Sequence, residues 1–174
     1  MSEHTGQIVG IDDHAVLRRG FTLYPRGVMA VASQIDGEPV GLAVSAFVSV
    51  SLDPPLMLIC IDAESRTWPK LKEAGGIGVS VIAEDQAWLG RQLASRRTDR
   101  FAGSTFDERE SGALLLAGST ARFDCSIENE TVAGDHLMVL LRVNAMEGSP
   151  DVRPLLWHDS EFRSVQPLAG SVAP

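Results

Sequence analysis

From residue 41 to residue 61 the chain reads Gly-Leu-Ala-Val-Ser-Ala-Phe-Val-Ser-Val-Ser-Leu-Asp-Pro-Pro-Leu-Met-Leu-Ile-Cys-Ile, and this stretch decides the fold. Phe47 to Ser51 alternates between apolar and polar side chains, the pattern of a half-buried β-strand. After Pro54 and Pro55, Leu56 to Ile61 is a continuous apolar run of strand length, which predicts a strand buried on both faces. The stretch therefore predicts two consecutive β-strands.

A β-hairpin is predicted just before these strands. Gly27 to Ser33 and Val40 to Val44 flank Asp36-Gly37, a dipeptide that readily takes the positive φ angles of a tight turn. Further upstream, Asp12 to Gly20 begins with acidic residues and carries arginines in its last turn, which favours a short helix. The front of the chain is expected to be one helix followed by antiparallel strands.

The rest of the chain is predicted to contain mainly strands, with brief helices. Hydroxyl caps, an early proline and the glycines that follow favour a helix directly after Ser65-Arg66-Thr67. A charged, glycine-rich loop is expected to reach about Gly118. The predicted elements are helices over Trp68 to Ala74 and Glu84 to Ala94, and strands over Ile77 to Ile82, Ala121 to Ile127, Leu137 to Val143, Leu155 to Trp157 and Glu161 to Val165.

This pattern predicts a mainly β fold. About seven short strands with only brief helices do not make the regular strand-helix alternation of a parallel nucleotide-binding sheet. A closed antiparallel barrel with a few short peripheral helices fits better. Residues 1–174 are expected to form a single domain with a core over about 13–165, and the tail after Gln166 is expected to be loose.

Composition excludes several classes of function. Fifteen basic against 23 acidic side chains give a net charge of −8, so no basic face is expected to bind nucleic acid. No apolar stretch is long enough to cross a membrane and no secretory signal opens the chain, so we expect a cytoplasmic protein. Cys60 and Cys125 are interpreted as reduced core residues, and no spacing of His and Cys predicts a metal site.

Ser65-Arg66-Thr67 is the most informative local motif. It lies at a predicted helix start directly after a strand, where free backbone N–H groups favour an anion, and its two hydroxyls and guanidinium add donors suited to a phosphate. The alternative is that Ser65 or Thr67 only caps the helix while Arg66 points into water. On composition alone this alternative is the commoner situation.

Two further features have a functional and a purely structural interpretation. The small side chains between Gly41 and Ser51 would let a flat ring lie close to the backbone, but ordinary strand alternation also explains them. His136 follows Gly134-Asp135 between two predicted strands. Its imidazole could donate a proton or hydrogen bond to a substrate, although a surface histidine in a hairpin connection is commoner.

Taken together, these pieces resemble the flavin-reductase-like family, the short-chain NAD(P)H:flavin oxidoreductases that supply reduced flavin to two-component monooxygenases. The resemblance covers roughly Asp13 to Val165, and the run that ends in Ser-Leu-Asp-Pro-Pro-Leu56 is its most specific part. Its other carriers are Tyr24-Pro-Arg-Gly-Val28, Ser65-Arg-Thr67, Asp99-Arg-Phe101, Gly134-Asp-His136 and Pro154-Leu-Leu156.

The resemblance implies an FMN-binding split β-barrel, antiparallel and Greek-key-like, that forms a homodimer and holds FMN or FAD near the subunit contact. It implies NADH or NADPH as co-substrate and transient flavin transfer to a monooxygenase. It places His136 against the nicotinamide. The residues that it implies for the flavin are Ala43, Ser45, Ala46 and Phe47 along the ring, Cys60, Ile61 and Asp62 at a strand end, Ser65, Arg66 and Thr67 at the phosphate, Gln92 and Leu93 at the border, and Arg100 and Phe101 over the phosphate side.

The leading hypothesis is hydride transfer from a nicotinamide nucleotide to a flavin. The family often has Thr and a second Ser where this chain has Ala43 and Ala46, so ring contacts here are expected from the backbone rather than from hydroxyls. Two alternatives stay open: a non-catalytic flavin- or haem-binding protein, and a flavoenzyme that holds its flavin tightly and reduces another acceptor.

Overall fold

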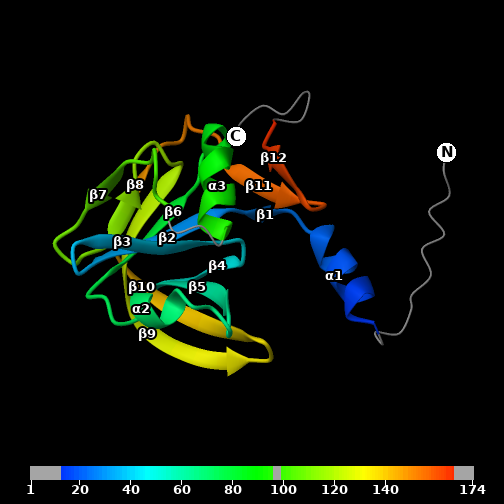
Figure 1. The fold of residues 1–174 in the computed structure, drawn as a ribbon, viewed down its shortest axis with the longest axis horizontal. Coiled ribbons are helices and arrows are strands. Elements are labelled where there is room, and N and C mark those ends of the chain that lie inside the picture. Colours follow the sequence, from blue (N-terminus) through cyan, green and yellow to red (C-terminus); the bar gives the residue numbers. More distant parts are fainter. Residues whose placement is uncertain (1–12, 96–98, 167–174) are drawn as a thin grey trace.

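The computed structural model describes residues 13–95 and 99–166, and its secondary structure is mainly β (Figure 1). Its helices are α1 (His14–Thr22), α2 (Trp68–Leu71) and α3 (Ala87–Ala94), with a 3₁₀ turn η1 (Glu84–Gln86) before α3. Its strands are β1 (Arg26–Gly27), β2 (Met29–Ile35), β3 (Glu38–Val44), β4 (Phe47–Leu52), β5 (Pro55–Asp62), β6 (Ile77–Val81), β7 (Phe106–Glu108), β8 (Leu114–Leu116), β9 (Ala121–Ala133), β10 (His136–Gly148), β11 (Leu155–His158) and β12 (Glu161–Ser164).

Seven strands form one antiparallel sheet in the order β3-β2-β6-β9-β10-β5-β4. Its two edge strands, β3 and β4, are consecutive in the chain, with only Ser45 and Ala46 between them. The sheet must therefore bend until its two edges meet at this corner. The predicted antiparallel β class is therefore confirmed. Within the described residues, β3 and β4 are not hydrogen-bonded to each other, so backbone pairing does not close the sheet into a barrel.

The turn predicted at Asp36-Gly37 is confirmed, with φ angles of 52° and 81°. It joins β2 and β3, whose register runs from Met29 opposite Val44 to Ile35 opposite Glu38. The second predicted hairpin is longer than expected, because β9 and β10 each have 13 residues and pair beyond the apolar runs seen in the sequence. Beyond the apolar runs, β9 and β10 remain paired through polar residues whose side chains face solvent.

The expectation that the strand after Pro55 is buried on both faces is wrong. In β5, Met57, Ile59 and Ile61 are buried, whereas the side chains between them are half-buried. Only one face of β5 is fully buried, and its other face, continued by the adjacent strands β4 and β10, is half-buried. A continuous apolar run cannot reveal this difference, because every position in it is apolar.

Two helices have bounds that differ from those predicted, and one predicted loop contains strands. The helix after Thr67 ends at Leu71, before the predicted Ala74, and α1 continues to Thr22. The expected loop before Gly118 contains the β7–β8 hairpin, which crosses β6. Gly78 allows this crossing, because a Cβ there would lie 2.0 Å from the carbonyl oxygen of Leu114.

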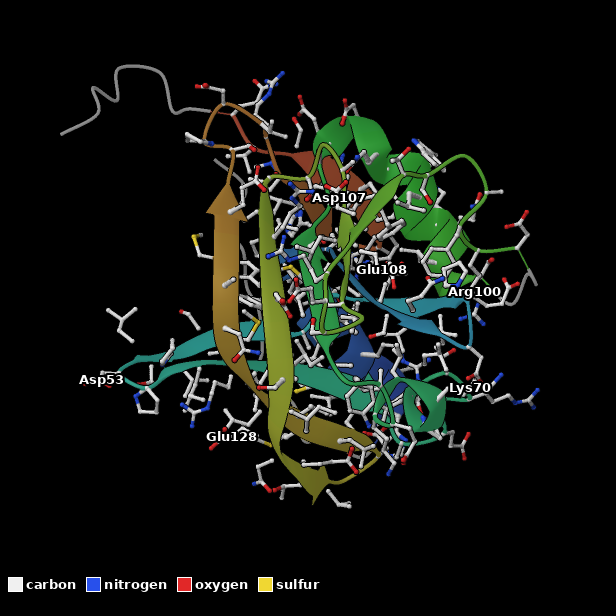
Figure 2. All side chains as sticks on the ribbon, turned by 90° about the vertical axis from the view of Figure 1, so that its left-hand side faces the viewer. Asp53, Lys70, Arg100, Asp107, Glu108 and Glu128 are labelled. Atoms are coloured by element: carbon white, nitrogen blue, oxygen red, sulfur yellow. The ribbon has the colours of Figure 1, made fainter. Side chains whose placement is uncertain are left out.

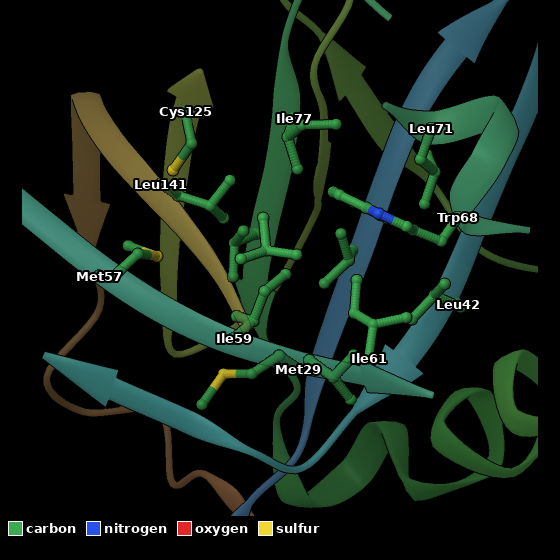
Figure 3. Packing of buried hydrophobic residues seen from close by; sticks show 14 residues of the cluster. Met29, Leu42, Met57, Ile59, Ile61, Trp68, Leu71, Ile77, Cys125 and Leu141 are labelled. Atoms are coloured by element: carbon green, nitrogen blue, oxygen red, sulfur yellow. The ribbon is translucent and has the colours of Figure 1, made fainter. Parts of the chain in front are cut away.

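Two apolar cores hold these elements together. The first lies inside the curved sheet, where Trp68 and Leu71 of α2 pack against strand residues such as Ile59, Ile77 and Leu141 (Figure 3). The second lies beneath α3 and contains Leu89, Leu93, Ile82, Leu116 and Leu155. The smaller sheet β1-β11-β12 borders this second core through Leu155. The predicted tail after Gln166 lies outside the described residues.

Helix α1 protrudes from the body (Figure 1) and buries none of its residues. Asp13 caps it, because its carboxylate accepts the backbone N–H of Ala15 at 2.7 Å. None of the described helices is long and apolar enough to span a bilayer.

Candidate functional site

A cavity of about 570 Å³ lies where the β3–β4 corner, the end of β5, the end of α3, β1 and the start of β10 meet. Both polar and apolar side chains line it. Its lining residues are Arg26, Leu42, Ala43, Val44, Ser45, Ala46, Cys60, Ile61, Asp62, Glu64, Ser65, Arg66, Thr67, Leu93, Ala94, Ser95, Arg100 and His136. The cavity brings together all of the site residues singled out in the sequence except Phe47, Gln92 and Phe101.

These three side chains lie behind the cavity wall. Gln92 donates from Nε2 to the carbonyl oxygens of Arg100 and Ala102, both at 3.0 Å. Phe101 packs edge-on against Phe106 with 5.3 Å between the ring centroids, and Phe47 packs against the first core. Gln92 and Phe101 therefore hold the segment that carries Arg100, while Arg100 itself reaches the cavity.

The segment Ser65 to Thr67 has a different local structure from the one expected. Helix α2 has four residues, too few for a substantial helix dipole, so an anion here would depend on side chains and loop N–H groups. The hydroxyl of Ser65 accepts the backbone N–H of Trp68 at 3.2 Å, which is a capping role. The hydroxyl of Thr67 makes no capping bond and instead accepts a hydrogen bond of 3.0 Å from Nη1 of Arg100.

Arg66 and Arg100 supply positive charge to this end of the cavity. Arg66 is exposed, whereas Arg100 is tied down, because Nη1 also donates to the carbonyl oxygen of Gly41 at 3.3 Å. Figure 2 places Arg100 at the edge of the molecule between α3 and the helix that carries Lys70. Two guanidinium groups beside the Thr67 hydroxyl provide the donors that a phosphate group requires.

Small side chains form the wall at the β3–β4 corner. Ala43, Ser45 and Ala46 line the cavity, and the carbonyl oxygen of Ala46 accepts the backbone N–H of Cys60 at 3.2 Å. The main chain is therefore near the cavity surface and held by strand pairing. A flat aromatic ring could approach this backbone closely, as the sequence suggested.

The two cysteines have different environments. Cys125 is buried in the first core, and its burial raises the pKa of the thiol to about 12, with a smaller effect from the nearby Asp124 carboxylate. Cys60 is half-buried and lines the cavity. The interpretation of both cysteines as core residues is therefore correct for Cys125 and wrong for Cys60.

His136 is the first residue of β10 and pairs with Asp62 at the end of β5. Its Nδ1–H donates to the carboxylate of Asp135 at 2.7 Å, and this hydrogen bond holds the pKa of the Asp135 carboxyl below its usual range. With Nδ1 occupied, Nε2 is the nitrogen available to a ligand. The ring is about half exposed, with a side-chain accessibility of 47%.

Sequence reasoning missed some lining residues. Leu42 and Val44 lie in the segment already singled out, and Ala94 and Ser95 follow Leu93 at the end of α3. Arg26 gave only a weak signal, as part of the Tyr24 to Val28 motif. In the structure its Nε is buried with no hydrogen-bond partner, a situation that costs about 1–3 kcal/mol.

A second, more apolar groove of about 390 Å³ adjoins the cavity and shares Ala43, Val44, Ser45, Ala94 and Ser95 with it. Trp157 and Phe162 line it and meet edge to face, with 5.1 Å between their ring centroids. The guanidinium of Arg91 lies 4.8 Å from the centroid of Phe162. The combined site thus has a cationic part and an aromatic part, which fits a ligand with phosphate and ring groups.

Within residues 13–95 and 99–166, no group of three or more His, Cys, Asp or Glu side chains is placed to hold a metal ion.

Fold and site together define a small antiparallel β protein with an arginine-lined ligand cavity. The model of the flavin-reductase-like domain matches residues 21–166, and the chain belongs to this family. The reductase subunit HsaB of a flavin-dependent monooxygenase from Rhodococcus jostii is 36% identical over 141 residues, which cover 81% of this chain and 72% of that relative.

A second relative, an NADH-dependent FAD reductase from Streptomyces globisporus, is 33% identical over 171 residues, covering 94% of this chain and 92% of the relative. Among solved structures, a homologue of nitrilotriacetate monooxygenase component B from Mycobacterium thermoresistibile superimposes with a TM-score of 0.87 at 31% identity, covering 93% and 92% of the two chains. The NADH:FAD oxidoreductase SgcE6 from Streptomyces globisporus, solved with NAD and FAD fragments, gives a TM-score of 0.86 at 32% identity, covering 93% and 98%.

Proposed function

We propose that this chain is an NAD(P)H:flavin oxidoreductase that supplies reduced flavin to a partner monooxygenase. The observation that carries the proposal is the cavity in which Arg66, Arg100 and Thr67 lie beside the small-residue wall at Ala43 to Ala46. Family membership supports it, as do relatives named NADH-dependent FAD reductase and reductase subunit of a monooxygenase.

The residues present fit a flavin nucleotide. Arg66, Arg100 and Thr67 would hold its phosphate, and the backbone of Ala43 to Ala46 would lie along its ring. The strand end at Cys60 to Asp62 would border the ring, and Leu93 would cover it. When bound, the flavin accepts a hydride, with its two electrons, from the nicotinamide, and one proton from solvent completes the reduced ring.

The chain's own contribution is alignment. Hydride transfer requires the two rings to be in contact at about 3–3.5 Å, and a rigid wall on strand backbone supplies such a fixed surface. His136, oriented by Asp135, would hydrogen-bond the nicotinamide through Nε2 and so fix its position. Gln92 and Phe101 would act indirectly, by positioning Arg100.

We further propose that the chain is one split-barrel domain, with a Greek-key-like arrangement, that forms a homodimer. The bend at Ser45 and Ala46, which brings the sheet edges together, supports the barrel. An apolar outer face supports the dimer: cross-strand neighbours on β4, β5 and β10 form it, namely Val48, Leu58, Cys60, Met138 and Leu140. Val48 and Met138 are 54% and 39% exposed, and Cys60 connects this face to the cavity.

A second copy of the chain is the proposed occupant of this face, since the face borders the cavity and would place the flavin near the subunit contact. The cytoplasm is the proposed location, because NADH and NADPH are generated and consumed there.

The test is oxidation of NADH and NADPH by the purified protein, with and without added FMN, FAD or riboflavin, followed as loss of reduced-nicotinamide absorbance. The expected result is saturable oxidation that requires added flavin. Flavin binding without oxidation in any combination would contradict the proposal and favour a binding protein. Flavin that stays bound through desalting and repeated turnover would favour a flavoenzyme with another acceptor.

A further inference from the structure

Arg26 lies at the edge of the cavity and forms no ion pair with any carboxylate of the described residues. The side chain is half-buried and lines the cavity from β1, and its Nε is sealed from solvent with no hydrogen-bond partner. The described residues include only one other such buried side-chain atom, Oγ1 of Thr120, which does not line the cavity.

Most other arginines of the described chain have partners, and Arg18, which has none there, is exposed to water. Arg142 pairs with Glu128, Arg163 pairs with Glu161 and Arg100 donates to Thr67. Arg66 has no carboxylate partner in the described residues either, but it is exposed, so water can hydrate its guanidinium. Arg26 is therefore the half-buried arginine of the cavity wall whose guanidinium forms no ion pair or side-chain hydrogen bond within the described residues, which favours an anionic ligand beside it.

Arg26 and the Ser65 to Thr67 segment approach the cavity from different sheets. Arg26 lies opposite Trp157 in the small β1-β11-β12 sheet. Ser65 to Thr67 follow β5 of the seven-stranded sheet, and Arg100 is hydrogen-bonded to Thr67 there. The cavity wall thus carries guanidinium groups from two directions. With one phosphate group held by Arg66 and Arg100, Arg26 is left for another anionic group.

We propose that Arg26 is a second anion subsite, which binds the pyrophosphate of a dinucleotide in this cavity. The proposal rests on the proposed function, because it assumes that a flavin phosphate occupies the Arg66–Arg100 position. Two sources have this chemistry: the nicotinamide dinucleotide that brings the hydride, and the adenylate half of FAD. A guanidinium suits either, since its planar array of donors matches the oxygens of a phosphate in a bidentate manner.

The test uses Arg26→Gln, which keeps hydrogen-bonding capacity without charge, and Arg26→Lys, which keeps charge without the planar fork. Arg163→Gln is the matched control, because it removes an exposed arginine that pairs with Glu161 outside the cavity. Dissociation constants for FMN and FAD are measured by fluorescence titration of the flavin-free protein. Binding of ADP-ribose to the FMN-loaded protein is measured by calorimetry, and the KM for NADH is measured with saturating FMN.

Loss of a charge-assisted contact is expected to weaken the affected ligand about tenfold or more in Arg26→Gln, less in Arg26→Lys and not at all in Arg163→Gln. If the nicotinamide dinucleotide is the source, ADP-ribose binding and the KM for NADH change while the FMN and FAD constants do not. If FAD is the source, the FAD constant changes while the FMN constant does not.

Three results would overturn the proposal. One is that all four constants in Arg26→Gln equal those of Arg163→Gln. Another is an equal loss for FMN and FAD, which would assign Arg26 to the flavin phosphate itself. The third is failure of both Arg26 variants to fold, which would make the residue structural. The binding measurements need no turnover, so a protein that binds these ligands but does not oxidise NADH would contradict the proposed function and still test Arg26.

Discussion

The guanidinium of Arg100 donates a hydrogen bond of 3.0 Å to the hydroxyl of Thr67, across 33 positions of sequence. It joins the segment after α3 to the connection between β5 and α2, and a second bond to the carbonyl oxygen of Gly41 reaches β3. Three segments are thereby fixed around the part of the cavity that we assign to a phosphate. The contact joins a charged donor to a neutral acceptor.

Thr67→Val is expected to weaken FMN binding about tenfold, because it removes the hydroxyl that fixes Arg100 and leaves side-chain volume nearly unchanged. Riboflavin, which lacks the phosphate, should bind the variant as well as it binds the wild type. Fluorescence titration of both ligands measures the difference.

Thr67→Ser retains the hydroxyl and is the control for this variant. It is expected to bind FMN within about twofold of the wild type. An equal loss of FMN and riboflavin binding in Thr67→Val would show that the residue does not act through the phosphate.

His136→Ala is expected to lower kcat on the order of 10²-fold with little change in the flavin dissociation constant, because the imidazole is assigned to the nicotinamide. Steady-state kinetics and flavin titration on the same preparation separate the two effects. His158→Ala changes the last residue of β11, which is not among the cavity-lining residues, and serves as the control. Unchanged kcat in His136→Ala would remove the histidine from the reaction.

Much of the fold was accessible to sequence reasoning, because its signals are local. Asp36-Gly37 has the turn chemistry that fixes the β2–β3 register, and Pro54-Pro55 separates two strands that both form. What failed depends on contacts between distant segments. The β7–β8 hairpin follows a charged, glycine-containing stretch, its second strand is an apolar run of only three leucines, and its position depends on the close approach of Leu114 to Gly78.

Gly78→Ala tests that approach. A Cβ at this position would overlap the main chain of Leu114, and main chain cannot rotate away as a side-chain end can, so we expect a loss of more than about 3 kcal/mol in the free energy of unfolding. Gly20→Ala in α1 is the matched control, because nothing lies within 4 Å of its added Cβ. That control should be neutral or stabilising by up to about 1 kcal/mol. Denaturant unfolding of both variants gives the comparison.

The burial of Cys125 predicts how stability changes at high pH. Its thiol pKa is raised from the ordinary value of 9.0 to about 12, so the neutral thiol is favoured in the folded protein and ionisation favours unfolding. The stabilisation is complete below about pH 9 and is lost as the pH rises towards 12. Denaturant unfolding between these values should show a decline that is smaller in Cys125→Ala. An identical pH slope in the two proteins would contradict the assignment.

Val48→Lys is expected to convert the proposed dimer to monomers, because it puts a charge on an outer face where Val48 lies opposite Leu58. Val48 is 54% exposed in the single chain, so the substitution should leave the folding of each chain unaffected. Val132→Lys at the far end of β9, where the valine is 73% exposed, is the control. Light scattering coupled to size-exclusion chromatography measures the masses. A wild-type protein that is monomeric at all concentrations would refute the dimer.

The sequence predicted which residues line the cavity better than it predicted what each of their side chains does. Ser65 and Thr67 looked equivalent in the sequence, yet Ser65 caps α2 while Thr67 accepts from Arg100. Gln92 was placed at the ligand, but its amide is used to hold the carbonyl of Arg100. The role of each of these side chains depends on the direction in which it points and on hydrogen bonds between distant segments. The order of residues in the sequence shows neither.

The walls of the cavity come from β1, the β3–β4 corner, the end of β5, the end of α3 and the start of β10. These segments belong to two sheets and a helix, so the complete wall exists only in the folded chain. A nucleotide that binds here therefore binds the native chain and not the unfolded one, and it adds to the free energy of unfolding by mass action, about 2.7 kcal/mol at a ligand concentration 100 times the dissociation constant. The supply of such a nucleotide would then influence how long each molecule survives heat and proteolysis.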